Sequence, residues 1–142
     1  MLIGLDPLLS PDLLFTLASM GHGDEIALVD ANFPAAALAR RLIRLDGVDG
    51  SAALGAVLSV LPLDNFVERP ASTMQVVGDP DALPSTVADF LEVLAAYGSV
   101  APVNPLERFD FYERARNAFA ILITGERRPY GNILLRKGVV FA

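Results

Sequence analysis

The sequence has little of what metal, thiol and disulfide chemistry needs. Its 142 residues include no cysteine and only one histidine. Without thiols there can be no disulfide framework, no thiol catalysis and no thiolate metal site. A metal would have to be bound mainly by carboxylates, and the stretch "HGDE" at residues 22–25 is a weak candidate for such a site. We therefore expect no bound metal.

Common nucleotide-binding and hydrolase motifs are also missing. The chain has no Gly-x-x-x-x-Gly-Lys phosphate loop, and no Gly-x-Gly-x-x-Gly turn follows a strand. It has no Gly-x-Ser-x-Gly nucleophile elbow either, so a Ser-His-Asp triad, which composition alone leaves open, has no support from a motif. A single residue that titrates near neutral pH remains available for acid–base chemistry.

Long uncharged apolar runs are absent, although apolar residues make up 53% of the chain. No run approaches the ~18 residues that a membrane helix needs. The amino-terminal stretch carries Asp6, Asp12 and two prolines where a signal peptide would have a basic region and an apolar run. We therefore expect a cytoplasmic protein whose surplus apolar surface is covered by other protein.

Basic residues are scarce in most of the chain. The formal net charge is -6, which disfavours nucleic acids and anionic membranes as partners. Residues 46–107 hold nine acidic residues and one basic residue, whereas residues 108–142 hold seven basic and three acidic residues. Two oppositely charged regions favour self-association, although pairing within one chain would give the same pattern.

Capping residues and apolar periodicity predict alternating helices and strands. The clearest helix begins after Ser10, with Pro11 at its first position, and stops at Gly21. Further helices are predicted from about residue 34, within 50–62 with Ser51 as the cap and Pro62 as the stop, from residue 85 with caps at both ends, and from about residue 110. The predicted strands are 25–31, 42–45, 72–79, a short one near Val100, 120–125 and 133–139. This order predicts one α/β domain over residues 1–142, with three layers and a mostly parallel sheet covered by helices on both faces.

The one histidine, His22, stands between Gly21 and Gly23. Glycines on both sides leave the ring without neighbouring side chains, so we expect it to be accessible. An unperturbed imidazole titrates near ~6.5, which suits proton transfer at neutral pH. A histidine just after a helix can instead cap its carboxyl end. The local pattern leaves both readings open.

Asp30 is expected at the carboxyl end of the first strand, the edge where open α/β sheets bind ligands. A turn aspartate before "NFPA" is an equally good reading of the local sequence. If the strand is extended, His22 and Asp30 lie up to roughly 26 Å apart, too far for one monosaccharide to span. Either the "GHGD" loop folds back towards the sheet edge, or another subunit completes the pocket.

The carboxyl-terminal part of the chain holds the other candidate ligand contacts. Arg108 offers a rigid fork of donors for hydroxyls or a carboxylate. Tyr130 could stack on a sugar or donate its hydroxyl, Gly131 would admit a close backbone approach, and Asn132 supplies a donor and an acceptor. The alternatives are a solvated arginine and a simple turn, and Pro-Tyr-Gly-Asn on its own favours the turn.

Four segments taken together are more specific than any single residue. They are "MGHGDEI" at 20–26, "DANFPA" at 30–35, "RFDFYERA" at 108–115 and "TGERRPYGNILLRKG" at 124–138. In this order they resemble the ribose pyranase and L-fucose mutarotase family along essentially the whole chain. The last two are similar to the L-fucose mutarotase branch, because the ribose branch usually carries a histidine where this chain has Arg108.

The resemblance implies a reaction and a set of site residues. The reaction is the interconversion of the α and β anomers of L-fucose or a related free sugar, without a cofactor or a metal. His22 matches the family's proton-transfer residue, and Tyr112 lies in a matching motif as a candidate contact. The implied sugar-binding residues are Asp30, Arg108, Tyr130, Gly131 and Asn132. The family also forms ring-shaped decamers with sites near subunit boundaries, so a homodecamer is expected.

Glu107 is a departure from the family pattern, which is expected to have a neutral asparagine there. A carboxylate in this position is expected to pair with Arg108 and to alter sugar preference. Three alternative functions stay open: a D-ribose pyranase that interconverts pyranose and furanose forms, a non-catalytic sugar-binding regulatory module, and a structural oligomer in which "GHGD" and "PYGN" are only turns.

Overall fold

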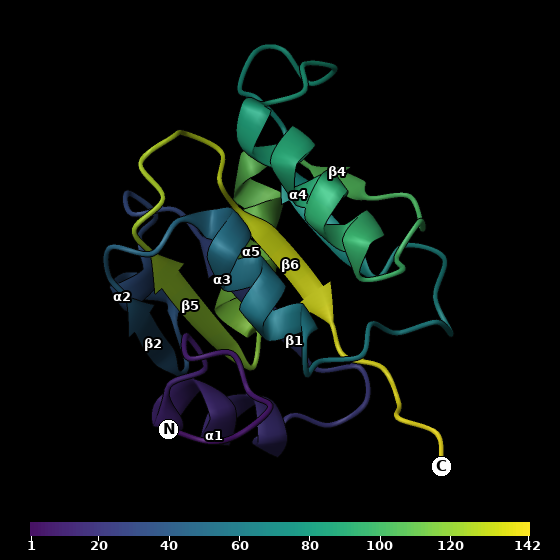
Figure 1. The fold of residues 1–142 in the computed structure, drawn as a ribbon. Helices are drawn as coiled ribbons and strands as arrows, with labels where there is room; N and C mark the ends of the chain where they lie inside the picture. The colour runs from purple at the N-terminus through teal and green to yellow at the C-terminus, as the bar shows by residue number, and fades with distance from the viewer.

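Helices and strands alternate along the chain, as the sequence predicts. The computed structural model describes residues 1–142, and its elements in chain order are α1 (Pro11–Ser19), β1 (Glu25–Val29), α2 (Ala35–Leu38), β2 (Leu42–Leu45), α3 (Gly50–Leu58), β3 (Ala71–Met74), α4 (Ser85–Ala96), β4 (Asn104–Leu106), α5 (Arg108–Asn117), β5 (Ala120–Thr124) and β6 (Ile133–Arg136). The strands form one sheet in the order β2-β5-β1-β6-β3-β4 (Figure 1). Only β6 runs antiparallel to its neighbours. The predicted mostly parallel sheet is confirmed.

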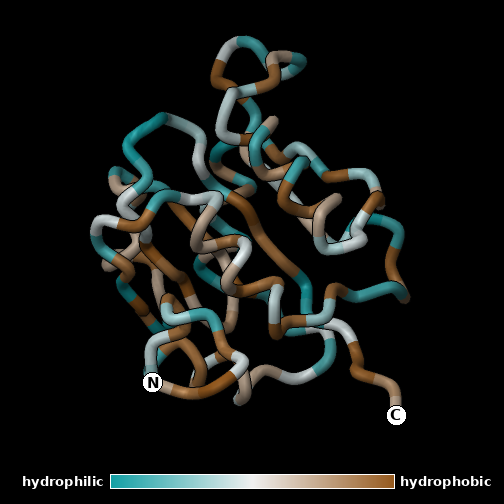
Figure 2. The backbone as a smooth tube through the Cα atoms, in the orientation of Figure 1, coloured by the Kyte–Doolittle hydropathy of each residue, from teal (hydrophilic) through white to brown (hydrophobic).

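The sheet is covered on both faces because its strands direct alternate side chains into two cores. Along β1, Ile26 and Leu28 pack in one core with residues of α1, α3 and α4. Ala27 and Val29 pack in the other core with residues of α2 and α5. Figure 1 shows α3 and α4 in front of the sheet and α5 behind it. In Figure 2, β6 is a brown band that leads out of a loop with teal segments, as expected for a strand buried on both faces.

Two helices begin differently from the prediction. Asp49 caps α3 by accepting the N–H of Ala52 at 2.8 Å. Ser51, the predicted cap, lies inside the helix, and its hydroxyl is buried without a partner. The N-cap position of α4 is Pro84, with no side-chain hydrogen bond, so the expected cap at that end is absent. Aspartate and serine are both favourable N-cap residues. Because Asp49 and Ser51 lie only two positions apart, the local sequence does not show which of them caps the helix.

Other boundaries also differ, and the strands predicted over 25–31 and 133–139 end at Val29 and Arg136. The short strand predicted near Val100 lies instead at β4, which contains Pro105 and pairs with β3 at the edge of the sheet. An edge strand tolerates proline, and for that reason its sequence gave no clear strand pattern. The helix predicted from about residue 34 is the four residues of α2, and the strand predicted over 72–79 ends at Met74. No helix of the chain combines the length and the apolar character that crossing a membrane requires.

Candidate functional site

A small polar pocket lies where β1 ends and α5 begins. Its volume is about 230 Å³. It is lined by Asp30, Asn32, Phe33, Met74, Val77, Arg108, Tyr112, Pro129, Tyr130 and Asn132. The structure therefore brings together four of the predicted sugar-binding residues and the candidate contact Tyr112. The volume is below the ~300–1,000 Å³ typical of sites for drug-sized ligands, so the pocket suits a smaller molecule.

Asp30 and Asn132 are joined in this pocket. The backbone amide of Asp30 donates to Oδ1 of Asn132 at 3.0 Å, and the Asp30 carboxylate accepts the N–H of Asn32 at 3.0 Å. Burial raises the pKa of Asp30, and hydrogen bonds from the amides of Asn32 and Gly131 oppose that rise. Asp30 is thus a turn residue and a pocket residue at once, so its two readings from the sequence are compatible.

Arg108 has an unpaired donor at the pocket. Its guanidinium lies over the rings of Phe109 and Tyr112, at 4.6 Å and 6.0 Å from their centroids. Its Nε is buried and has no hydrogen-bond partner. An unpaired buried donor costs about 1–3 kcal/mol, and an acceptor on a ligand would recover that energy. This unpaired donor belongs to a residue that lines the pocket, and it favours a ligand with oxygen acceptors.

Glu107 does not pair with Arg108, so that expectation is wrong. Its carboxylate is the N-cap of α5 and accepts the N–H groups of Phe109 at 2.8 Å and Asp110 at 3.2 Å. These amides have no partner within the helix, and a carboxylate at this end also complements the helix dipole. Glu107, which departs from the family pattern, therefore serves as a helix cap.

Tyr130 is held in an uncommon backbone conformation. Its φ is 60°, a value that few residues other than glycine adopt. Its hydroxyl accepts the N–H of Val77 at 3.0 Å, which joins this loop to the segment after β3. Gly131 is required next, because a Cβ there would lie 2.7 Å from Cγ of Glu126 and 3.4 Å from Cβ of Asp30. The predicted turn therefore exists, and the same turn places Tyr130 and Asn132 in the pocket.

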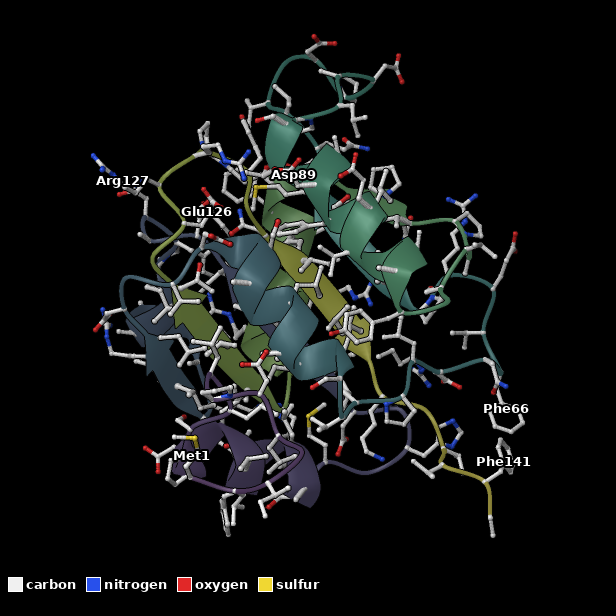
Figure 3. The ribbon with its side chains drawn as sticks, viewed as in Figure 1. Met1, Phe66, Asp89, Glu126, Arg127 and Phe141 are labelled. Carbon is white, nitrogen blue, oxygen red and sulfur yellow. The ribbon has the colours of Figure 1, made fainter.

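Glu126 organises this loop and was missed from the sequence. It is 4% exposed, and its carboxylate accepts the Gly50 amide at 3.2 Å and the Arg128 amide and Nε at 3.0 and 3.1 Å. Figure 3 shows Glu126 and Asp89 at the same end of the molecule, and Arg128 also pairs with Asp89 at 2.9 Å. Hydrogen bonds from Arg128 outweigh burial and lower the pKa of Glu126 to about 2. The only sign of it in the sequence was its position in "GERRPYGN".

His22 lies away from this pocket. It precedes β1, whereas Asp30 follows β1, and the five residues of the strand put the two ends about 16 Å apart. The "GHGD" loop does not fold back towards the pocket, because the Gly23 amide donates to the Lys137 carbonyl beyond the far end of β6. The imidazole does not cap α1 either. It lies 3.1 Å from Oδ1 of Asp64, and its side chain is 45% exposed.

A larger cavity of about 600 Å³ lies near the carboxyl ends of α3 and α4. Its lining is mostly apolar, although Asp64, the partner of His22, borders it. No buried side-chain donor of its lining lacks a partner, in contrast to Arg108 in the smaller pocket. The smaller pocket is therefore the better candidate for a specific polar ligand.

Comparisons with known proteins identify the family of this chain. The model of the RbsD / FucU transport protein family matches residues 3–140. The chain is similar to the human protein named fucose mutarotase, with 48% identity over 96% of this chain and 93% of that protein. It is 48% identical to an L-fucose mutarotase of Glaesserella parasuis, over 98% and 96% of the two chains. The crystal structure of a Streptococcus pneumoniae fucose mutarotase in complex with L-fucose superposes with a TM-score of 0.93 and 43% identity, over 99% of this chain and 100% of that one.

Proposed function

Because this chain belongs to the RbsD / FucU transport protein family, we propose that it catalyses the interconversion of the α and β anomers of L-fucose. The observation that carries the proposal is the pocket of Asp30, Arg108, Tyr130 and Asn132, in which a buried donor lacks an acceptor. Relatives named fucose mutarotase, 48% identical over nearly the whole chain, support the choice of sugar. No cofactor or metal takes part in the proposed reaction.

The reaction opens and recloses the sugar ring. A base takes the proton from the anomeric hydroxyl, the C1–O5 bond breaks, and O5 receives a proton, which leaves an open-chain aldehyde. Rotation about C1–C2 exposes the other face of the carbonyl, and the reverse proton transfers reclose the ring as the other anomer. No atom or charge is gained overall, so one imidazole that can take and return a proton is sufficient. We assign this role to His22.

The pocket residues would hold the ring and select the sugar. The unpaired Nε of Arg108 is suited to a hydroxyl oxygen, and the carboxylate of Asp30 is suited to accepting from neighbouring hydroxyls. A sugar that leaves such groups unpaired is disfavoured, and this is how the site would discriminate between stereoisomers. The rings of Phe33 and Tyr112, 5.3 Å apart, provide an apolar surface for the methyl group of a 6-deoxy sugar.

His22 would have to reach the sugar from a second subunit. Within one chain the two parts of the site lie at opposite ends of β1, and each is flanked by exposed aromatic side chains. Phe66 and Phe141, 65% and 68% exposed, lie together in Figure 3, and the Phe66 ring is 5.2 Å from the ring of His22. Phe109, 61% exposed, is next to the pocket residue Arg108. Exposed apolar groups of this kind mark protein interfaces.

We therefore propose a homo-oligomer in which one subunit's His22 faces the pocket of its neighbour. The family resemblance implies ten subunits, which sedimentation velocity would measure directly. A cytoplasmic location completes the proposal, and a chain without cysteine is compatible with that reducing compartment.

Saturation-transfer NMR on free sugars tests the proposed activity. Irradiation of one anomeric proton of L-fucose should reduce the signal of the other anomer when the protein is present. His22→Ala should lose most of this transfer, by the ~10²–10⁴-fold typical of general acid–base catalysis. D-ribose, followed in its pyranose and furanose signals, and D-galactose complete the panel. Transfer with ribose alone would instead indicate a pyranase, and saturable binding of fucose without transfer would indicate a non-catalytic binding module.

A further inference from the structure

The segment between β3 and α4 is joined to the pocket through one backbone group. In Figure 1 this segment is a loop that projects from the end of the molecule beyond α4. Residues 76–83 make two backbone hydrogen bonds among themselves. The one hydrogen bond that leaves these residues runs from the Val77 N–H to the Tyr130 hydroxyl, at 3.0 Å. Val77 and Tyr130 both line the pocket, so this bond lies at the site itself.

A tight turn fixes the direction of the Val77 N–H. The Asp79 N–H donates to the Val76 carbonyl at 3.1 Å, and Gly78 between them has a φ of +80°. Tyr130 is the one residue other than glycine with a positive φ, so the φ of Val77 is negative. These are the features of a type II turn, whose third position requires a positive φ and favours glycine. Val77 holds the second position of this turn.

Tyr130 depends on its surroundings because its backbone is strained. Its φ of 60° is a left-handed conformation that a side-chain-bearing residue keeps only where neighbouring groups hold it. The preceding residue is tied to α4, since the Pro129 carbonyl accepts the buried Thr86 hydroxyl at 3.2 Å. The Val77 N–H holds the other end of the tyrosine side chain. Tyr130 is therefore held both beside its backbone and at its hydroxyl.

We propose that Val77 is a positioning residue for the mutarotase site: its N–H holds the Tyr130 hydroxyl as an acceptor and leaves the phenolic hydrogen to donate to an oxygen of the bound sugar. A hydroxyl has one hydrogen and two lone pairs, and an N–H on one side of the oxygen excludes the hydrogen from that side. The hydroxyl makes no other hydrogen bond within the chain. That this arrangement serves sugar binding rests on the proposed function.

The pocket then presents a set of groups that suits neighbouring sugar hydroxyls. Two donors, Nε of Arg108 and the Tyr130 hydroxyl, have no acceptor within the chain, and the Asp30 carboxylate lines the same pocket. A sugar hydroxyl can accept from one of these donors and donate to the carboxylate. Hydrogen bonds in such a chain strengthen one another. Sugar binding should therefore strengthen the bond from the Val77 N–H to Tyr130.

Amide hydrogen exchange, followed by NMR on the ¹⁵N-labelled, deuterated protein, measures this coupling. Saturating L-fucose should slow exchange of the Val77 amide at least about 3-fold more than that of the Asp79 amide, which bonds within the turn alone. Without sugar, Tyr130→Phe should speed exchange of the Val77 amide about 3–10-fold, the effect of one lost hydrogen bond. Equal slowing of the two amides by L-fucose would overturn the proposal.

Val77→Pro removes the N–H and keeps an apolar side chain. Proline suits the second position of a type II turn, and Val76, in a β-bridge with Asp79, has the extended backbone that proline requires before it. The proline ring carbon that replaces the amide hydrogen also displaces the Tyr130 hydroxyl. KM for L-fucose should rise about 10-fold, while kcat should fall less than about 3-fold because His22 is untouched.

Val77→Ala is the matched control, because it keeps the N–H and shortens the side chain. KM should rise by less than about 3-fold, since the valine side chain is 59% exposed and loses little apolar contact. A rise in KM equal to that of Val77→Pro would show that the side chain serves the site and that the proposal is wrong. If Val77→Pro does not fold, amide exchange in the parent protein still decides the proposal.

The same measurements separate this proposal from the proposed function. Binding of L-fucose with the expected slowing at the Val77 amide, but without anomer exchange, would refute the mutarotase reaction and not the role of Val77. Anomer exchange with equal slowing of the two amides would refute only the role of Val77. Absence of both fucose binding and anomer exchange would refute both.

Discussion

Replacing Glu126 by glutamine tests whether one buried carboxylate holds the pocket loop in place. Glu126→Gln keeps the shape of the side chain but removes its charge and one of its two acceptor oxygens. The oxygen of the glutamine can satisfy the Arg128 amide and Nε, as Oε1 does now at 3.0 and 3.1 Å. Its NH₂ would then face the Gly50 N–H, which now donates to Oε2 at 3.2 Å. Two donors would point at each other in a buried place.

The expected loss of stability has two sources, the Gly50 amide that is left without an acceptor and the lost charge of the carboxylate. A buried N–H without an acceptor costs about 1–3 kcal/mol. The loss of charge at Arg128 adds little, because that side chain is 43% exposed and water screens it. We therefore expect the free energy of unfolding to fall by about 1–3 kcal/mol. For a chain of this length that corresponds to a fall in Tm of about 3–10 °C.

Thermal unfolding followed by circular dichroism measures this change, at one protein concentration because oligomer stability depends on concentration. Glu113→Gln is the control: Glu113 lies on α5 with its side chain 68% exposed, so its replacement should change stability by less than about 0.5 kcal/mol. Glu126→Gln should also raise KM for L-fucose more than it lowers kcat, because the loop carries Tyr130. If both variants unfold at the parent temperature, Glu126 does not hold the loop.

Four further outcomes are expected. Arg108→Ala should raise KM for L-fucose by about 10-fold or more without lowering Tm, because the variant loses a buried donor that has no partner in the protein; equal sugar binding would contradict this. Gly131→Ala should abolish sugar binding in titration calorimetry, since the new Cβ would lie 2.7 Å from Cγ of Glu126. Gly55→Ala should stabilise α3 by about 0.5–1 kcal/mol in denaturant unfolding, because its nearest neighbours lie at ordinary contact distance, 3.9 Å and beyond. Acid titration should show stability falling between about pH 5 and pH 2, since Glu126 and Asp64 have folded pKa values of about 2, below their ordinary values of 4.5 and 3.8, and both contribute fully only above the ordinary values.

The local sequence was sufficient to predict an element where all the signals for that element lie within one segment. The helix after Ser10 has its cap, its proline and its apolar positions within nine residues, and the structure places it at Pro11–Ser19 with the Ser10 side chain as N-cap. The buried strands "EIALV" and "AILIT" are similarly self-contained, because burial on both faces selects a continuous apolar run. The position of Asp30 at the end of β1 followed from that strand alone.

Pairs distant in sequence were not predictable in this way. Glu126 reaches the amide of Gly50 and Asp64 reaches the ring of His22, contacts that span 76 and 42 positions. No periodicity connects such partners, and each carboxylate reads locally as a surface residue. Glu107 shows the opposite error: a neighbouring opposite charge suggested an ion pair, and the unpaired amides of the next helix turn took the carboxylate instead.

The sequence showed that His22 and Asp30 are far apart, but it did not show how the two residues could serve one site. Eight positions and an extended strand left a folded-back loop and a second subunit as alternatives, and the structure removes the first of them for the single chain. The central claim of this account is therefore a shared site, with His22 and the Arg108 pocket contributed by different subunits.

Mixing two impaired variants, assayed at an L-fucose concentration below the KM of the parent protein, tests that claim most directly. His22→Ala and Arg108→Ala chains, each with a different affinity tag, are co-expressed and purified through both tags, and anomer exchange of L-fucose is measured by NMR. With the residues on different subunits, about one quarter of the sites in a randomly mixed ring are intact, so exchange should return although each variant alone has little. Mixed rings as inactive as either variant alone would contradict the account.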